Sequence, residues 1–188
     1  MKILFFTFFI IISLTSKSFA KTQFDIDGFT LGMILSDKLT PEQIMQGKEE
    51  KYYNTKYIKT LEFKKSSFLP NYEWYQFSFK RNDKKEKIID IQVVNYYKDN
   101  VWECFFKRDE LLDEIKTKMK KQIKAIDDLG TIKFSKSFAK GTKTETWVDL
   151  KGNKSIYVSC YNFDETETRK DQLRMGISHK YFEKNAFK

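Results

Sequence analysis

The chain has 188 residues, of which 40% are hydrophobic, and its formal net charge is +9 at pH 7. This length fits one ordinary domain, and the lack of a repeat, a Pro/Gly-rich linker or a long apolar segment after residue 20 excludes a repeat protein, a two-domain chain and a membrane-spanning domain. The positive charge favours an acidic partner. However, 31 of the 35 basic residues are lysine and only four are arginine, and phosphate and base recognition depends mainly on arginine. We therefore expect a solvated lysine surface and no nucleic-acid partner.

Residues 1–20 predict a secretory signal peptide. Lys2 supplies the positive start, residues 3–14 are apolar, and Ser18-Phe19-Ala20 places small residues before a cleavage site after Ala20. The apolar stretch is shorter than the roughly 20 residues that cross a bilayer, and Lys21 stands where a lipoprotein would have cysteine. We therefore expect an exported domain of residues 21–188, periplasmic or secreted, whose 33 basic and 26 acidic residues leave a charge of +7.

The stretch "FDIDGFTLGM", residues 24–33, invites three interpretations. A calcium loop that begins at the first aspartate needs oxygen ligands at its fifth and twelfth positions, which are Phe29 and Ser36. A phosphate-binding loop needs a different glycine spacing or a lysine, and Gly28 and Gly32 supply neither. The remaining interpretation is a short strand followed by a turn at the two glycines.

Part of this stretch also carries a resemblance. The run "IDGFTLGM" follows the predicted export signal with the pattern I-x-G-h-x-L-G-M, in which h is apolar. In this motif, and in the order of its predicted elements, the chain resembles small periplasmic domains of uncharacterised bacterial proteins that begin in this way. The resemblance implies an envelope location and an α+β fold, and such domains bring no catalytic residues to carry over.

The rest of the chain predicts strands on either side of one long helix. A short helix first begins at Thr40, where "TPEQ" supplies a cap, a proline and a glutamine in order. Apolar residues then recur at three- and four-residue steps from Val101 to Ile126, with Asn100 as cap and Gly130 as stop. Six segments read as strands: 57–63, 72–80, 88–97, 144–150, 155–161 and 173–182. We therefore predict an α+β fold, in which an antiparallel sheet packs against one long amphipathic helix of about 26 residues, plus a short N-terminal helix.

The two cysteines are predicted to form a disulfide. Cys104 and Cys160 are the only pair in the chain, and an oxidising compartment allows them to join. A redox or nucleophilic thiol is the alternative, but no C-x-x-C spacing is present.

The sequence offers no assembled catalytic, metal or cofactor site. His179 is the single histidine, so neither a zinc site of His and Cys ligands nor a hydrolase motif can be built around it. In phase with Leu173 and Ile177, it is expected to be a hydrogen-bonded sheet residue. Acidic pairs such as Asp127 and Asp128 are more often solvated than catalytic.

One segment suggests a binding surface. Residues 48–59, "KEEKYYNTKYIK", interleave tyrosines with lysines, an arrangement that suits sugars or anionic polymers. The alternative is that the tyrosines cover the sheet while the lysines are solvated. The candidate binding residues are Tyr52, Tyr53, Lys56, Tyr57 and Lys59.

These observations favour an exported, non-enzymatic envelope module that needs no cofactor and binds a protein or an anionic polymer. Contact with a membrane would be peripheral. Two alternatives stay open: a secreted hydrolase that uses clustered carboxylates, and a cationic effector that acts on membranes.

Overall fold

The computed structural model describes residues 23–97, 100–136, 139–164 and 170–188. The predicted signal peptide, residues 1–20, lies outside them. Their elements are, in chain order, a 3₁₀ turn at Leu35–Asp37, α1 (Pro41–Ile44), β1 (Lys48–Glu50), β2 (Ile58–Ser66), β3 (Leu69–Lys80), β4 (Ile88–Tyr97), α2 (Val101–Met119), β5 (Ile123–Lys136), β6 (Ala139–Leu150), β7 (Lys154–Phe163), β8 (Asp171–His179) and α3 (Lys180–Asn185).

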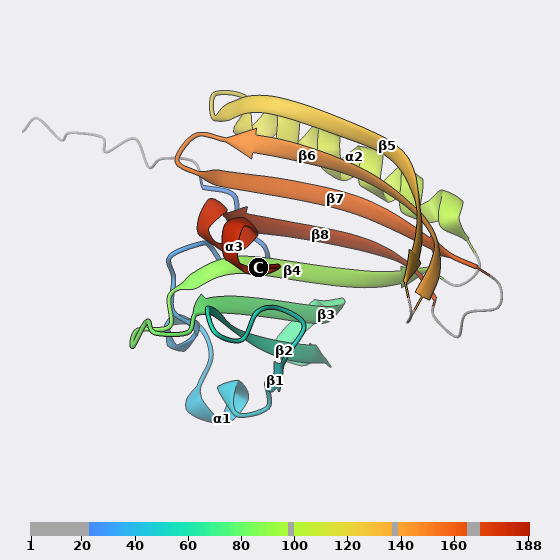
Figure 1. Ribbon diagram of the computed structural model, residues 1–188. Helices are drawn as coiled ribbons and strands as arrows, with labels where there is room; N and C mark the ends of the chain where they lie inside the picture. Colours follow the sequence, from blue (N-terminus) through green and yellow to red (C-terminus); the bar gives the residue numbers. More distant parts are fainter. Residues whose placement is uncertain (1–22, 98–99, 137–138, 165–169) are drawn as a thin grey trace, which may run out of the picture.

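One antiparallel sheet of eight strands contains all of these strands, in the order β1-β2-β3-β4-β8-β7-β6-β5 (Figure 1). Strands β1 to β4 form one meander and β5 to β8 a second. The two meanders meet where β4 pairs with β8, from Asp90 opposite Ser178 to Tyr97 opposite Asp171. At one end β5 and β6 bend toward the face that carries α3 (Figure 1), near a register shift between Asp128 and Thr131. Gly130 at this shift has a φ of +63°, which glycine adopts without strain.

The predicted fold class is wrong. The described chain is mostly an eight-stranded sheet with three short helices, not a sheet packed on one long helix. Helix α2 ends at Met119, and the stretch that continues its apolar spacing, including Ile126, lies in β5. Residues 123–136 pair with β6 along almost their whole length. These inter-strand bonds outweigh a helical periodicity that is only local.

Several local predictions are confirmed. Thr40 caps α1, since its hydroxyl accepts from the backbone of Gln43 while the Gln43 side chain accepts from the backbone of Thr40. The strands predicted at 144–150 and 155–161 lie in β6 and β7, which are joined by a turn at residues 151–153. The expected first strand, in contrast, is only a single bridge between Ile26 and Phe29.

Between these bridge partners, Asp27 and Gly28 form a tight turn with φ values of +52° and +74°. A two-residue turn with positive φ at both positions is the usual site of an Asp-Gly pair. The motif is therefore a turn, as expected. It anchors the N-terminal segment, because the Asp27 carboxylate accepts hydrogen bonds from the Tyr75 hydroxyl and from Asn71 at 2.8 Å.

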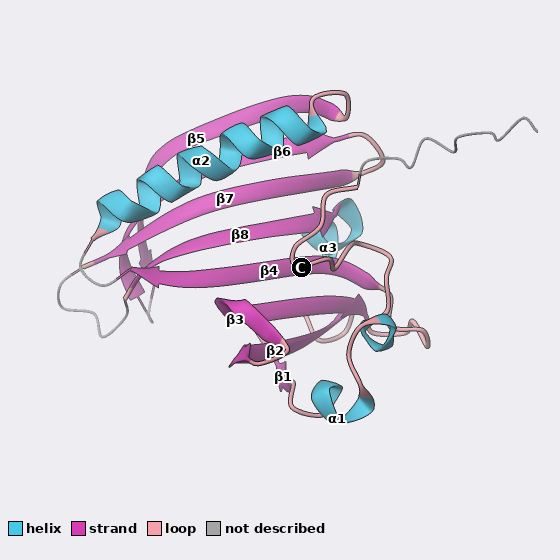
Figure 2. Cartoon of the chain, turned by 180° about the vertical axis from the view of Figure 1, so that it is seen from behind, coloured by secondary structure: helices cyan, strands magenta, loops and turns pink. Residues whose placement is uncertain are grey.

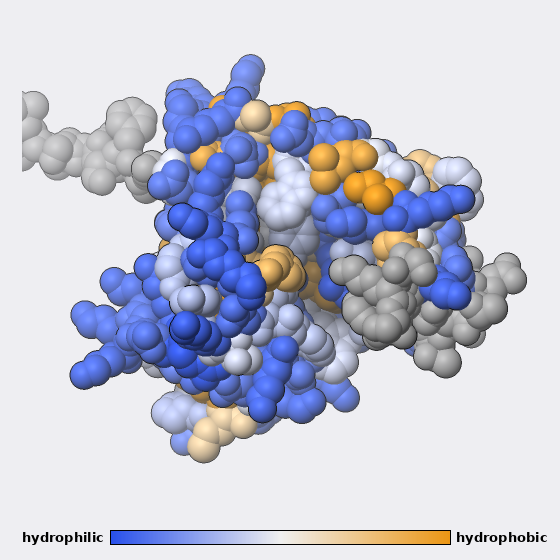
Figure 3. Space-filling model, in the orientation of Figure 1, coloured by the Kyte–Doolittle hydropathy of each residue, from blue (hydrophilic) through white to orange (hydrophobic). Residues whose placement is uncertain are grey.

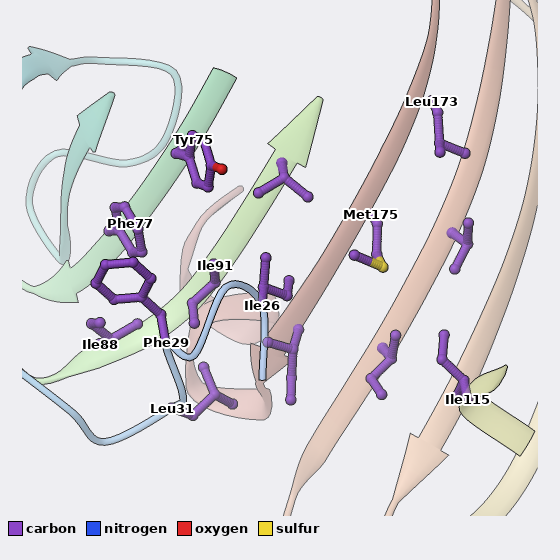
Figure 4. Close-up of a cluster of buried hydrophobic side chains, with 14 of the residues drawn as sticks. Ile26, Phe29, Leu31, Tyr75, Phe77, Ile88, Ile91, Ile115, Leu173 and Met175 are labelled. Atoms are coloured by element: carbon purple, nitrogen blue, oxygen red, sulfur yellow. The ribbon is translucent and has the colours of Figure 1, made fainter. Parts of the chain in front are cut away.

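The core lies on one face of the sheet. The strand period of two residues places Tyr75, Phe77 and Phe79 on this face, and all three are fully buried. The N-terminal segment covers one part of it, where Figure 4 shows Phe29 directed at Phe77, and the two ring centroids lie 4.8 Å apart. The other part is covered by α2, which packs mainly against β7 and β8 (Figure 2). No helix in the described ranges is long and apolar enough to span a membrane.

The two cysteines join α2 to β7. Their sulfurs are bonded and their Cα atoms lie 5.9 Å apart, a separation that fits the predicted disulfide. Both side chains are buried in the core beneath the helix.

Replacing both cysteines by alanine is expected to lower the free energy of unfolding. The bridge closes a loop with a sequence separation of 56 residues, which corresponds to roughly 4 kcal/mol in the chain-entropy description. Urea titration of the double variant against the oxidised protein measures this difference. Equal midpoints, or free thiols in the purified exported protein, would contradict the disulfide.

Candidate functional site

The face of the sheet opposite the core is polar, and we call it the polar face. Because side chains alternate along each strand, the residues between the core positions of β3, β4, β8 and β7 all point to this side. The cross-strand register arranges them in rows. One row contains Thr60, Ser78, Asp90, Ser178 and Ser155.

The C-terminal helix covers one end of the polar face (Figure 1). Phe182 and Ala186 pack on Ile58 and Ile89 in a small second core. Tyr53 closes this core, with its ring 4.8 Å from that of Phe182. The row of hydroxyls and Asp90 is therefore buried at this end of the sheet.

Asp90 is the centre of a buried hydrogen-bond network. Its carboxylate accepts from the Ser178 hydroxyl and, at 3.0 Å, from the Gln92 amide, which also donates to the Tyr53 hydroxyl at 2.8 Å. Burial raises the pKa of Asp90 to about 7, although the bonds from Ser178, Gln92 and Ser78 oppose the rise. The nearby Glu183 carboxylate on α3 adds to it.

Glu145 on β6 is also a buried carboxylate, but its pKa shifts in the opposite direction. It accepts from Lys143 at 2.8 Å, from the Trp147 indole at 2.9 Å and from the Ser159 hydroxyl at 2.6 Å. Burial alone would raise its pKa, but these three donors outweigh burial and hold the pKa below its usual value. The bond from Ser159 joins Glu145 to β7, so this carboxylate helps to order the two strands.

Arg174 lies near the middle of the polar face. Its guanidinium carbon lies 4.8 Å from the centre of the Tyr161 ring, and its Nε donates to Gln172 at 3.3 Å. Within the described ranges it has no carboxylate partner and its two terminal nitrogens donate to no protein group. Neither nitrogen is a buried unsatisfied atom, so both are open to solvent.

Tyrosines surround this arginine. Its charge lowers the pKa of Tyr53, Tyr96 and Tyr157, although burial is the largest influence on each and raises it overall. Tyr157 lies flat over Gly176, where a Cβ atom would come within 2.5 Å of the ring. Figure 3, which views this face, shows pale side chains among hydrophilic ones in its recessed centre.

A hollow of about 410 Å³ adjoins the polar face at the β1 edge of the sheet. Trp74, Glu50, Glu62, Lys48 and the exposed Gln46 are among the residues that line it. Lys48 pairs with Glu50 at 2.6 Å, and Gln76 donates to Glu62 at 2.5 Å. Burial raises the pKa of Glu62, and the neighbouring Glu50 raises it further.

The five residues predicted as a binding surface do not form one surface. Tyr52 is 60% exposed, and partial burial together with the charge of Glu62 raises its pKa. Tyr53 packs against α3 instead. Lys56 and Tyr57 line a separate hollow of about 330 Å³ beside α3. Lys59 pairs with Glu86 at 2.5 Å on the opposite side of its strand.

His179 has a structural position. Its Nδ1 accepts from the backbone of Tyr181 at 3.0 Å and so caps α3. Burial and the charges of Lys80 and Lys154 lower its pKa. In the part of the chain that the structure describes, no group of three or more His, Cys, Asp or Glu side chains is placed to hold a metal ion.

Arg174 and Trp74 were missed as functional candidates, although the sequence contains the necessary signal. In "LRMGISH", Leu173, Met175 and Ile177 alternate with Arg174, which must then face away from the core. Trp74 stands in the same phase as Gln76 in "YEWYQFSF". What the sequence does not show is that the register brings both residues into one row, on either side of Val94.

The chain matches no protein-family model, no curated protein sequence and no solved structure. Its function must therefore be argued from the polar face itself.

The Asp90 carboxyl predicts an unusual dependence of stability on pH. Since its pKa is raised to about 7 in the fold and is about 3.9 in an unfolded chain, the fold binds the proton more tightly. Its contribution is fully present below about pH 4 and is lost as the pH rises through about 7.

We expect Asp90→Asn to remove this dependence. The free energy of unfolding of the variant, relative to that of the unaltered protein, should therefore increase by a few kcal/mol between pH 4 and pH 8. Urea titrations across this range give the difference, with Asp113→Asn on the exposed side of α2 as the control. A difference between Asp90→Asn and the unaltered protein that is flat with pH would show that Asp90 does not titrate in this range.

Proposed function

We propose that the protein is an exported, non-enzymatic envelope module whose polar face binds an anionic partner through Arg174. The observation that carries the proposal is the open guanidinium: it is half-buried, held by Tyr161 and Gln172, and has no carboxylate partner among the described residues. An arginine fixed in this way offers two parallel N–H donors to a carboxylate or phosphate. Export rests on the predicted signal peptide.

The composition of the face supports binding over catalysis. Asp90 is fully buried and Glu145 is saturated by three donors, so neither carboxylate is free to react with a ligand. The tyrosines supply rigid rings with polar tips, which suit recognition at a partly wet surface.

The arginine is tested by substitution. Arg174→Gln is expected to weaken binding of lipopolysaccharide or wall teichoic acid by about tenfold or more, since a charge-assisted pair of hydrogen bonds is lost. Arg174→Lys keeps the charge but not the planar fork, and should give an intermediate loss. Calorimetric titration gives the affinities.

Lys84→Gln is the matched control, because it removes one positive charge from the exposed loop between β3 and β4. Equal affinities for Arg174→Gln and Lys84→Gln would show that net charge, and not the site, drives binding. Absence of binding to either polymer by the unaltered protein would also count against the proposal.

A second candidate, a secreted hydrolase that uses paired carboxylates, gains one specific observation. Glu50 and Glu62 line the same hollow, and Glu50 is paired with Lys48 while the pKa of Glu62 is raised. A carboxyl whose pKa is raised, beside a second carboxyl in the same hollow, is the arrangement of a general acid and its partner. Binding is favoured because both carboxyls already have protein partners, Lys48 and Gln76.

If the hydrolase is correct, Glu62→Gln will lower the release of reducing ends from oligosaccharides by at least a hundredfold, because it removes the acid. The matched control is Glu110→Gln on the exposed surface of α2. No release above background by the unaltered protein would dismiss this candidate.

A further inference from the structure

The row of residues that contains Arg174 also contains Trp74. The register places Trp74 opposite Val94 and Val94 opposite Arg174, all on the polar face. Two strand spacings therefore separate Trp74 from Arg174, a distance of about 10 Å between backbones. Val94 lies between them on β4.

The hollow beside Trp74 differs in chemistry from the arginine. It is lined by two carboxylates, Glu50 and Glu62, which accept hydrogen bonds, and by three ammonium groups, Lys48, Lys64 and Lys65, which donate them. The Lys64 ammonium lies 5.2 Å from the centre of the Trp74 ring, on one side of the indole. Its volume of about 410 Å³ is within the range of small-molecule sites. Because charges of both signs line the hollow, it is matched neither to a purely anionic phosphate chain nor to a purely cationic group.

Hydroxyl groups satisfy both kinds of partner, because each can donate and accept. An aromatic ring beside such groups provides a flat apolar surface for the C–H face of a sugar. One end of the row therefore suits an uncharged polyhydroxyl group, and the other end suits an anion.

We infer that the ligand of the polar face is an acidic saccharide, with a sugar ring against Trp74 in the hollow and an acid group on Arg174. This inference rests on the proposed function and adds the chemical class of the ligand.

Two matched pairs of probes test it: trigalacturonate against its methyl ester, and sialyllactose against lactose. Tripolyphosphate and poly-glutamate serve as anions without sugar. We expect at least one acidic saccharide to bind at least tenfold more tightly than its neutral counterpart and than either sugar-free anion. Calorimetry with the full exported chain gives the affinities.

Variants separate the two ends of the site. Trp74→Leu should weaken binding of the acidic saccharide at least tenfold and leave binding of poly-glutamate unchanged, whereas Arg174→Gln should weaken both. Gln46→Trp fills the hollow from an exposed loop position and should reproduce the effect of Trp74→Leu even if that variant folds poorly.

The outcomes distinguish the two proposals. If tripolyphosphate or poly-glutamate binds as tightly as both acidic saccharides, or if Trp74→Leu and Gln46→Trp have no effect, the saccharide inference is overturned and anion binding stands. Neutral saccharides that bind as tightly as the acidic ones overturn the saccharide inference as well. If no anionic probe binds, or Arg174→Gln changes nothing, both proposals fall.

Discussion

The pairing of β4 with β8 is the constraint on which the rest of the structure depends. It joins two meanders that are far apart in sequence into one sheet, and it fixes the register between Asp90 and Ser178 and between Val94 and Arg174. A slip of one residue would exchange the core and polar sides of every strand in the second meander. The buried bond from Ser178 to Asp90 exists only in the observed register, so the polar network also specifies the core.

Much of the fold could be predicted because alternation and capping act locally. The bounds of β4, the phase of β3, the cap at Thr40 and the turn between β6 and β7 agree with the sequence. The second edge strand could not be predicted, because Ile123 and Ile126 continue the spacing of α2 and only pairing with β6 makes them extended. The site was missed for a related reason. Arg174 and Trp74 lie 100 residues apart in sequence, and only the strand order makes them neighbours in one row.

Two buried carboxylates show how one sheet face can give opposite electrostatic results. Asp90 accepts hydrogen bonds from neutral donors only, so burial is the dominant influence and raises its pKa. Glu145 accepts from an ammonium as well as from a hydroxyl and an indole, and these donors outweigh burial and lower its pKa. The difference places a carboxyl with a lowered pKa at the β6 side of the face and one with a raised pKa beneath α3. Between them Arg174 stays unpaired, because every nearby acid already has its own partners.

The position of Cys160 has a consequence for the opposite surface. Its side chain points into the core, while Ser159 and Tyr161 on either side of it point to the polar face. The covalent link to α2 therefore restrains, from behind, the backbone that holds the ring under Arg174. In a compartment where the sulfurs stay oxidised, the bridge limits the movement of this backbone, so the redox chemistry of the surroundings and the shape of the polar face are linked through three consecutive residues.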